Sequence, residues 1–197
     1  LRLADNLTDL CAAELGELAP HPRPVDVPTL LRDVVAELTP AAERKGARIV
    51  LRGAGELATV AWDEDRVRHV LLILGENAIQ RVQTGGAITF GIEVDREEVT
   101  LTVADDGRPL ASDVRAWVFQ GSYRSNDAAQ QAKTADTGLW LYVCRKIVEA
   151  HGGHLWVAEN GAQGSCLQLI LPLAVARERR APDRTERPRL DTPLAGC

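Results

Sequence analysis

Several features that this sequence lacks restrict the classes of protein to which it can belong. Methionine is absent from all 197 residues, and the chain begins at Leu1. We therefore expect a fragment of a longer protein, with further domains outside it. No apolar run approaches the roughly 18 residues that a membrane-spanning helix needs, and no signal peptide is recognisable. We expect no contact with a membrane within this chain.

Paired cysteines and an excess of positive charge are also missing. The four cysteines form no C-x-x-C pair and are scattered along the chain as Cys11, Cys144, Cys166 and Cys197. Such spacing argues against a zinc site or a disulfide framework and is typical of reduced residues in a cytoplasmic protein. The net charge of −5 argues against nucleic acid as the main partner, because phosphate backbones attract basic surfaces.

Hydrophobic periodicity divides the chain into four segments. Residues 1–18 carry an apolar stripe at helical spacing, which must pack on something because a lone helix of this length is marginal in water. The proline-rich residues 19–26 predict a linker. Residues 27–175 predict a folded domain. Residues 176–197 are rich in Arg, Pro, Glu and Asp and predict a disordered tail.

Within the folded domain, helical and strand patterns alternate. Helices are predicted for residues 28–45, for residues 63–82 and for a segment that starts near Gly138 and ends at the pair Gly152-Gly153. Predicted strands are residues 25–27, residues 47–53 and 57–63 around a glycine-containing turn, a hairpin of residues 88–94 and 99–103, and a closing hairpin of residues 154–160 and 166–173. This order predicts an α/β two-layer sandwich, with one mixed, mostly antiparallel sheet and helices on one face.

Asp105 is the first candidate for a binding function. Val99, Leu101 and Val103 alternate along one strand, so position 105 continues the same buried face. A carboxylate on the core side is costly unless something donates hydrogen bonds to it, and the amino group of a ligand can do so. The alternative is a local Asp-Gly turn in which Asp105 or Asp106 binds nearby backbone.

Asn77 is the second candidate, because it lies within the amphipathic helix 63–82. Asparagine is a mediocre helix former, but its carbonyl oxygen suits Mg²⁺ that carries phosphates and waters. The alternative is an exposed polar residue without a ligand. Ile73, one turn earlier on the same face, offers no ligand atom.

The long segment between "DDG" (105–107) and "DTG" (136–138) predicts a lid or a disordered loop. It leads into the helix that starts near Gly138, with Thr137 or Asp136 suited to cap it. The free N–H groups and the dipole at such a helix start favour an anion. A carboxylate acceptor, an amide ligand, a lid and an anion-binding helix start are therefore expected to surround one site.

The order and spacing of four motifs resemble those of sensor histidine kinases. The motifs "DEDRVRHVLLILGENAIQRV", "VADDG", "VFQGSYRS" and "TGLWLYVCRKIVEAHGG" are similar to their N box, first glycine box, phenylalanine box and second glycine box. Residues 1–18 resemble the end of the second dimerisation helix of these kinases. The remainder, to about Leu173, resembles their catalytic and ATP-binding domain, the Bergerat fold that is shared with gyrase-type ATPases.

The resemblance implies a role for each candidate residue. Asp105 would accept a hydrogen bond from the adenine amino group, Gly107 would allow close backbone approach, and Asn77 would coordinate Mg²⁺ bridging the phosphates. His151 resembles a structural histidine before the glycine pair. The implied nucleotide-binding residues are Asn77, Arg81, Asp105, Gly107, Thr137, Gly138 and Leu139; the only implied metal ligand is Asn77, and no residue is assigned as catalytic.

Five positions depart from the family pattern. Ile73 stands where these kinases commonly have a second Asn. Gln80 and Arg81 stand where these kinases frequently have a Lys followed by an aromatic residue or His. Pro109 and Trp140 stand where they have glycines. Proline fixes φ near −65° and removes an N–H, and the indole of Trp140 needs space that a triphosphate or lid would otherwise use.

Two functions therefore compete. In the first, the chain is the ATP-binding catalytic domain of a sensor histidine kinase, which binds ATP and Mg²⁺ and transfers the γ-phosphate to a histidine outside this chain, because none of its four histidines lies in an H-box context. In the second, it is a pseudokinase that acts as an interaction module. An anti-sigma-type serine kinase of the same fold fits less well, because such proteins lack the dimerisation-helix segment.

The kinase resemblance also implies partners and a location. The partners are a phosphoacceptor dimerisation domain, upstream in the same polypeptide or in a separate protein, and a response regulator. A homodimer is expected for the full-length form. The expected location is the cytoplasm, either in a cytoplasmic protein or in the cytosolic part of a membrane-anchored sensor.

Overall fold

Five strands form the main sheet in the computed structural model, which describes residues 18–53, 59–109, 140–158 and 164–173. Their order across the sheet is β2-β4-β5-β7-β6. β2 and β4 are parallel neighbours, whereas β4, β5, β7 and β6 pair antiparallel. The strands are β2 (Arg48–Arg52), β4 (Ala87–Val94), β5 (Glu98–Asp105), β6 (His154–Ala158) and β7 (Ser165–Pro172). The predicted mixed, mostly antiparallel sheet is confirmed.

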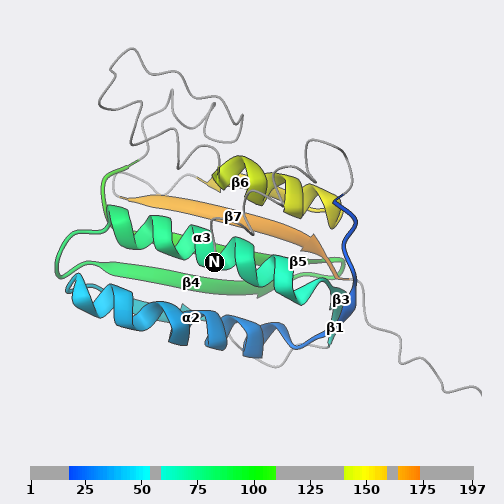
Figure 1. Cartoon of the computed structure of the whole chain (residues 1–197), viewed down its shortest axis with the longest axis horizontal. Coiled ribbons are helices and arrows are strands. Elements are labelled where there is room, and N and C mark those ends of the chain that lie inside the picture. Colours follow the sequence, from blue (N-terminus) through cyan, green and yellow to red (C-terminus); the bar gives the residue numbers. More distant parts are fainter. Residues whose placement is uncertain (1–17, 54–58, 110–139, 159–163, 174–197) are drawn as a thin grey trace, which may run out of the picture.

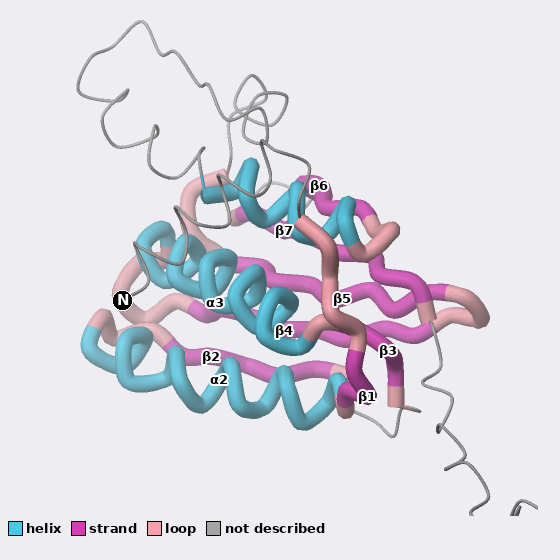
Figure 2. The backbone as a smooth tube through the Cα atoms, turned by 45° about the vertical axis from the view of Figure 1, so that its right-hand side comes forward, coloured by secondary structure: helices cyan, strands magenta, loops and turns pink. Residues whose placement is uncertain are grey.

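In the described part of the chain, three helices form the second layer. Helix α2 (Val27–Arg44), helix α3 (Glu64–Arg81) and the helix of residues 140–150 lie on the same side of the main sheet (Figure 1, Figure 2). The predicted two-layer α/β sandwich is therefore confirmed. The predicted dimerisation-helix segment, the lid segment and the tail fall outside the described residues.

Alternation along the strands separates the two faces of the sheet. Val99, Leu101 and Val103 of β5 are buried, as are Ile88 and Phe90 of β4. On α3, every residue of the predicted apolar face is buried, because 3.6 residues per turn bring the members of this set to one side: Val67, Val70, Leu71, Leu74 and Ala78. The core thus forms between these two apolar faces, as the sequence pattern predicts.

A second, small sheet corrects one expectation. The segments 47–53 and 57–63 do form strands, but they do not pair around a shared turn. β2 lies parallel to β4, whereas β3 (Val60–Trp62) pairs antiparallel with β1 (Arg23–Val25), inside the segment expected to be a linker. Trp62 is fully buried, and its Nε1–H donates to the Pro172 carbonyl oxygen at 3.0 Å. Burial of this indole favours the separate position of β3.

The start of α3 and the end of the helix of residues 140–150 are joined by hydrogen bonds. Asp63 is the N-cap of α3, and its Oδ1 accepts from the Arg66 N–H at 3.2 Å. The Asp63 N–H donates to His151 Nε2 at 3.2 Å, and His151 Nδ1 lies 2.8 Å from the Ile147 carbonyl oxygen. Because a backbone N–H can only donate, the proton of this imidazole is on Nδ1. His151 therefore has the expected structural role.

A matched pair of substitutions on one face of the sheet tests where the hydrophobic core ends. Val94 and Val99 are directly opposite on β4 and β5, but Val94 is 48% exposed and Val99 is 0% exposed. Val99→Ala is expected to lower the free energy of unfolding by about 2 kcal/mol, through lost burial and a residual cavity. Val94→Ala is expected to cost less than about 0.5 kcal/mol. Urea denaturation of both variants measures the difference, and equal losses would contradict the described packing.

Candidate functional site

The Asp105 carboxylate is buried at the last residue of β5. Its Oδ1 accepts from the Gly107 N–H at 2.9 Å, and its Oδ2 accepts from the Ser165 hydroxyl. The position on the buried face is as predicted, and the local bond to Gly107 is the one that an Asp-Gly turn predicts. Both oxygens are thus held in defined directions, so the carboxylate is oriented by the fold.

Ser165 and Gly164 are site residues that the sequence reasoning missed. Ser165 is buried and lies directly opposite Asp105 in the pairing of β5 with β7. Gly164 has φ +78°, and a Cβ at this position would lie 1.7 Å from the Asp105 carbonyl oxygen. The only signal in the sequence is the glycine of "GAQGS", which lies between the two strands of the predicted closing hairpin. The register between β5 and β7 brings this position against the Asp105 backbone, so a residue without a Cβ is needed there.

The end of α3 closes this site from the other side. Arg81, the last residue of α3, has its Nε 3.5 Å from Asp105 Oδ2, and its guanidinium donates to the Arg108 carbonyl oxygen. Gly107 touches the same region, since a Cβ there would lie 2.5 Å from the Arg81 carbonyl oxygen. Gly107 is therefore packed closely against the end of α3. Of the predicted residues, Arg81, Asp105 and Gly107 are brought together.

The other predicted residues divide into two groups. Asn77 is half-buried on α3, one turn before Arg81, so both project from one side of the helix. Ile73, a further turn back, is buried. Thr137, Gly138 and Leu139 lie outside the described residues, so their roles stay predictions.

The structure also locates Trp140 and Pro109, the two residues that depart from glycines of the family pattern. Trp140 is half-buried and packs against the hydrophobic core. Pro109 is exposed at the end of the segment that follows β5. A bulky residue at the start of the helix of residues 140–150 thus has a packing role, which gives a structural reason for a tryptophan at this position.

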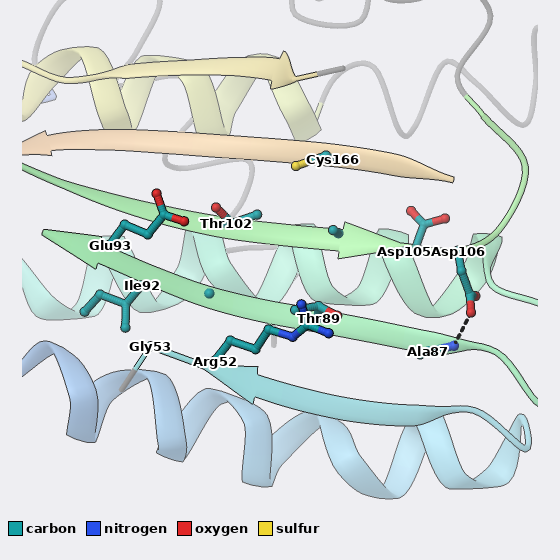
Figure 3. A pocket seen from close by; sticks show the side chains of 12 residues that line it. Arg52, Gly53, Ala87, Thr89, Ile92, Glu93, Thr102, Asp105, Asp106 and Cys166 are labelled. Atoms are coloured by element: carbon teal, nitrogen blue, oxygen red, sulfur yellow. Dashed lines mark hydrogen bonds between the residues drawn. The ribbon is translucent and has the colours of Figure 1, made fainter. Parts of the chain in front are cut away.

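A depression of about 590 Å³ lies on the sheet beside this site (Figure 3). Thr89, Gly91, Thr102 and Ala104 line its middle, on strand positions that alternate with the buried core residues. Asp105 contributes to one end, but Asn77 and Arg81 do not line it. We therefore distinguish this depression from the site between the end of β5 and α3.

Cys166 also lines the depression, and its thiol is a poor candidate nucleophile. Burial raises the pKa of Cys166, and the negative charge of Asp105 raises it further. Because the thiolate is the reactive form of cysteine, a raised pKa keeps this side chain in its unreactive thiol form near neutral pH.

Comparison with known protein families identifies the domain. Residues 62–175, from β3 to just beyond β7, match the family described as "Histidine kinase-, DNA gyrase B-, and HSP90-like ATPase". This match covers more than half of the chain. The protein belongs to this ATPase family. Within the family it has a histidine kinase ATP-binding catalytic domain, as its sequence motifs predicted.

The relatives of this ATPase domain are sensory kinases. The chain is 32% identical over 155 residues to the adaptive-response sensory kinase SasA of Synechococcus elongatus, which covers 78% of this chain and 39% of that protein. The SasA of Crocosphaera subtropica is 28% identical over 174 residues, or 87% of this chain and 44% of that protein. The chain thus spans about two fifths of the length of these relatives. None of the helices in its described part has the length and apolarity to cross a membrane.

Solved structures share the fold. Full-length ShkA in complex with AMPPNP superposes with a TM-score of 0.70 and 29% identity, over 88% of this chain and 37% of that one. The histidine kinase ThkA in complex with the response regulator protein TrrA has a TM-score of 0.69 and 21% identity, over 87% of this chain and 48% of that one. At this lower identity, the ThkA comparison supports the fold alone.

Two glycines with positive φ test the contact between Gly164 and Asp105 in the ATPase domain. Alanine at Gly85 (φ +84°) meets nothing within 4 Å, so Gly85→Ala is expected to cost only the backbone strain of about 1–2 kcal/mol. Gly164→Ala adds a collision with the Asp105 backbone and is expected to cost more than about 3 kcal/mol, or to prevent folding. Urea denaturation compares the two, and equal costs would show that β7 can move away from Asp105.

Proposed function

We propose that this chain binds ATP and Mg²⁺ beside the end of β5 and serves as the catalytic domain of a two-component sensor histidine kinase. The single observation that carries the proposal is the Asp105 carboxylate, buried at the end of β5 and oriented by Gly107 and Ser165. A carboxylate only accepts hydrogen bonds, whereas the amino group attached to the adenine ring only donates them. The name of one structural relative supports the choice of ligand, because that kinase is in complex with AMPPNP.

The base, the metal and the phosphates are assigned to different residues of the site. Asp105 accepts from the adenine amino group and thereby sets the orientation of the base. Asn77 offers an amide oxygen from α3 to Mg²⁺, which commonly keeps several waters and is held by few protein oxygens plus substrate phosphates. Thr137, Gly138 and Leu139, at the predicted helix start, are assigned to the phosphates, where free backbone N–H groups favour an anion.

Catalysis in this proposal depends on positioning. Bound ATP with Mg²⁺ supplies the transferable γ-phosphoryl group. In phosphoryl transfer, orientation and electrostatic stabilisation do most of the work and the protein does little covalent chemistry. The residues of this chain therefore orient the nucleotide, and the attacking imidazole belongs to a histidine outside this chain.

The partners follow from that division of labour. We propose a phosphoacceptor dimerisation domain, located upstream in the same polypeptide or in a separate protein, and a homodimer for the full-length form. A response regulator is the proposed receiver of the phosphoryl group, and one structural relative is a kinase in complex with such a regulator. We place the domain in the cytoplasm. The relatives are named as kinases, and this favours the kinase hypothesis over the pseudokinase alternative.

Asp105→Asn tests the adenine contact. The amide carries a donor group in place of an acceptor oxygen, and it faces the amino group of adenine. We expect the Kd for ATP with Mg²⁺ to rise about 10- to 100-fold, the effect of a hydrogen bond to a charged group. The matched control is Asp106→Asn, because Asp106 is exposed and binds the Ala87 N–H at 2.8 Å. Calorimetric titration measures both, and an unchanged Kd for Asp105→Asn would refute the assignment.

Asn77→Ala tests the metal contact. Without the amide oxygen, Mg²⁺ should strengthen ATP binding less than it does in the wild type, whereas the affinity for ATP without Mg²⁺ should stay within about twofold, because the base contacts are intact. Gln80→Ala, at an exposed position on the same helix, is the control and should preserve the full effect of Mg²⁺. Titrations with and without Mg²⁺ decide the matter. An undiminished effect of Mg²⁺ in Asn77→Ala means that another group binds the metal.

A further inference from the structure

Arg81 contacts the carboxylate that is proposed to recognise adenine. Its Nε lies 3.5 Å from Asp105 Oδ2, and the exposed fractions of the two side chains are 27% and 2%. The guanidinium also donates to the Arg108 carbonyl oxygen. Arg81 is thus anchored at two points, one on the buried carboxylate and one on the backbone just beyond β5. From the end of α3, Arg81 therefore forms one side of the site.

The contact with Asp105 is an ion pair without a hydrogen bond. A separation of 3.5 Å exceeds the usual 2.7–3.2 Å range for N–H···O bonds. Within the described residues, Arg81 Nε is a buried polar atom that finds no hydrogen-bond partner. Oδ2, the oxygen it approaches, already accepts from the Ser165 hydroxyl. The guanidinium therefore adds positive charge at Oδ2 in a geometry that leaves its own donor unsatisfied.

We propose that Arg81 competes with the adenine amino group for Asp105 and so determines the affinity and base preference of the nucleotide site. The inference rests on the proposed ATP-binding function. An amino group that donates to Asp105 must approach a carboxylate whose Oδ2 is already next to the guanidinium. Because a carboxylate can accept several hydrogen bonds, the base can still donate to Asp105. The positive charge of the guanidinium beside Oδ2 nevertheless draws on the same negative charge and weakens the bond that Asp105 offers to the amino group. A nucleotide without this amino group does not use that bond.

The competition separates two nucleotides in a binding experiment. Purine riboside triphosphate carries hydrogen where ATP carries the amino group. Arg81→Met keeps the length of the side chain but removes its charge and its donors. We expect Arg81→Met to lower the Kd for ATP about tenfold, and to change the Kd for purine riboside triphosphate by less than about twofold. Arg108→Met is the matched control, since it removes a neighbouring exposed arginine but retains the carbonyl oxygen that Arg81 binds.

Each other outcome overturns a specific claim. An equal gain for both nucleotides would show that Arg81 obstructs the site by its bulk, and weaker ATP binding would show that Arg81 holds the nucleotide; either result overturns the competition. If neither protein binds either nucleotide although both melt cooperatively, the proposed function fails and the competition fails with it. Arg81→Gln, which also removes the charge, carries the same prediction if Arg81→Met does not fold.

Discussion

The register between β5 and β7 brings Asp105 opposite Ser165, and the site depends on this pairing. Shifting that register by one residue would turn Asp105 away from the helical layer, because successive side chains of a strand point to opposite faces. The Ser165 hydroxyl and the Gly107 N–H then hold the two oxygens of the carboxylate. Gly164 permits the close approach of β7 at the same place. Orientation of the carboxylate is therefore a property of the sheet.

The helical layer contributes the site residues that do not belong to the sheet. Helix α3 carries Asn77 and ends at Arg81, and its start is joined to the helix of residues 140–150 through Asp63 and His151. The neutral imidazole uses both of its nitrogens in that junction, one as donor and one as acceptor. The two helices are in this way joined at the end of α3 that lies opposite Arg81.

The fold class was predictable because its signals are local. Alternating apolar residues mark β4 and β5, and the apolar face of α3 repeats every three or four positions; both patterns need only neighbouring residues. Asp105 could be chosen because it continues the alternation of Val99, Leu101 and Val103. The pairing of the two strands between residues 47 and 63 was predicted wrongly, because proximity in sequence favours a hairpin. Burial of Trp62 and the parallel partner of β2 decide otherwise.

By itself, the sequence determined the two-layer fold, the buried position of Asp105 and the membership of the ATPase family, since periodicity and motif order are properties of the chain alone. Only the tertiary structure decided which groups surround that carboxylate. Ser165 is 60 positions away from Asp105, and Arg81 is on a different element. No local pattern encodes either contact. They arise because strand pairing and helix packing bring distant segments together, and the free energy of that packing is shared among the whole core.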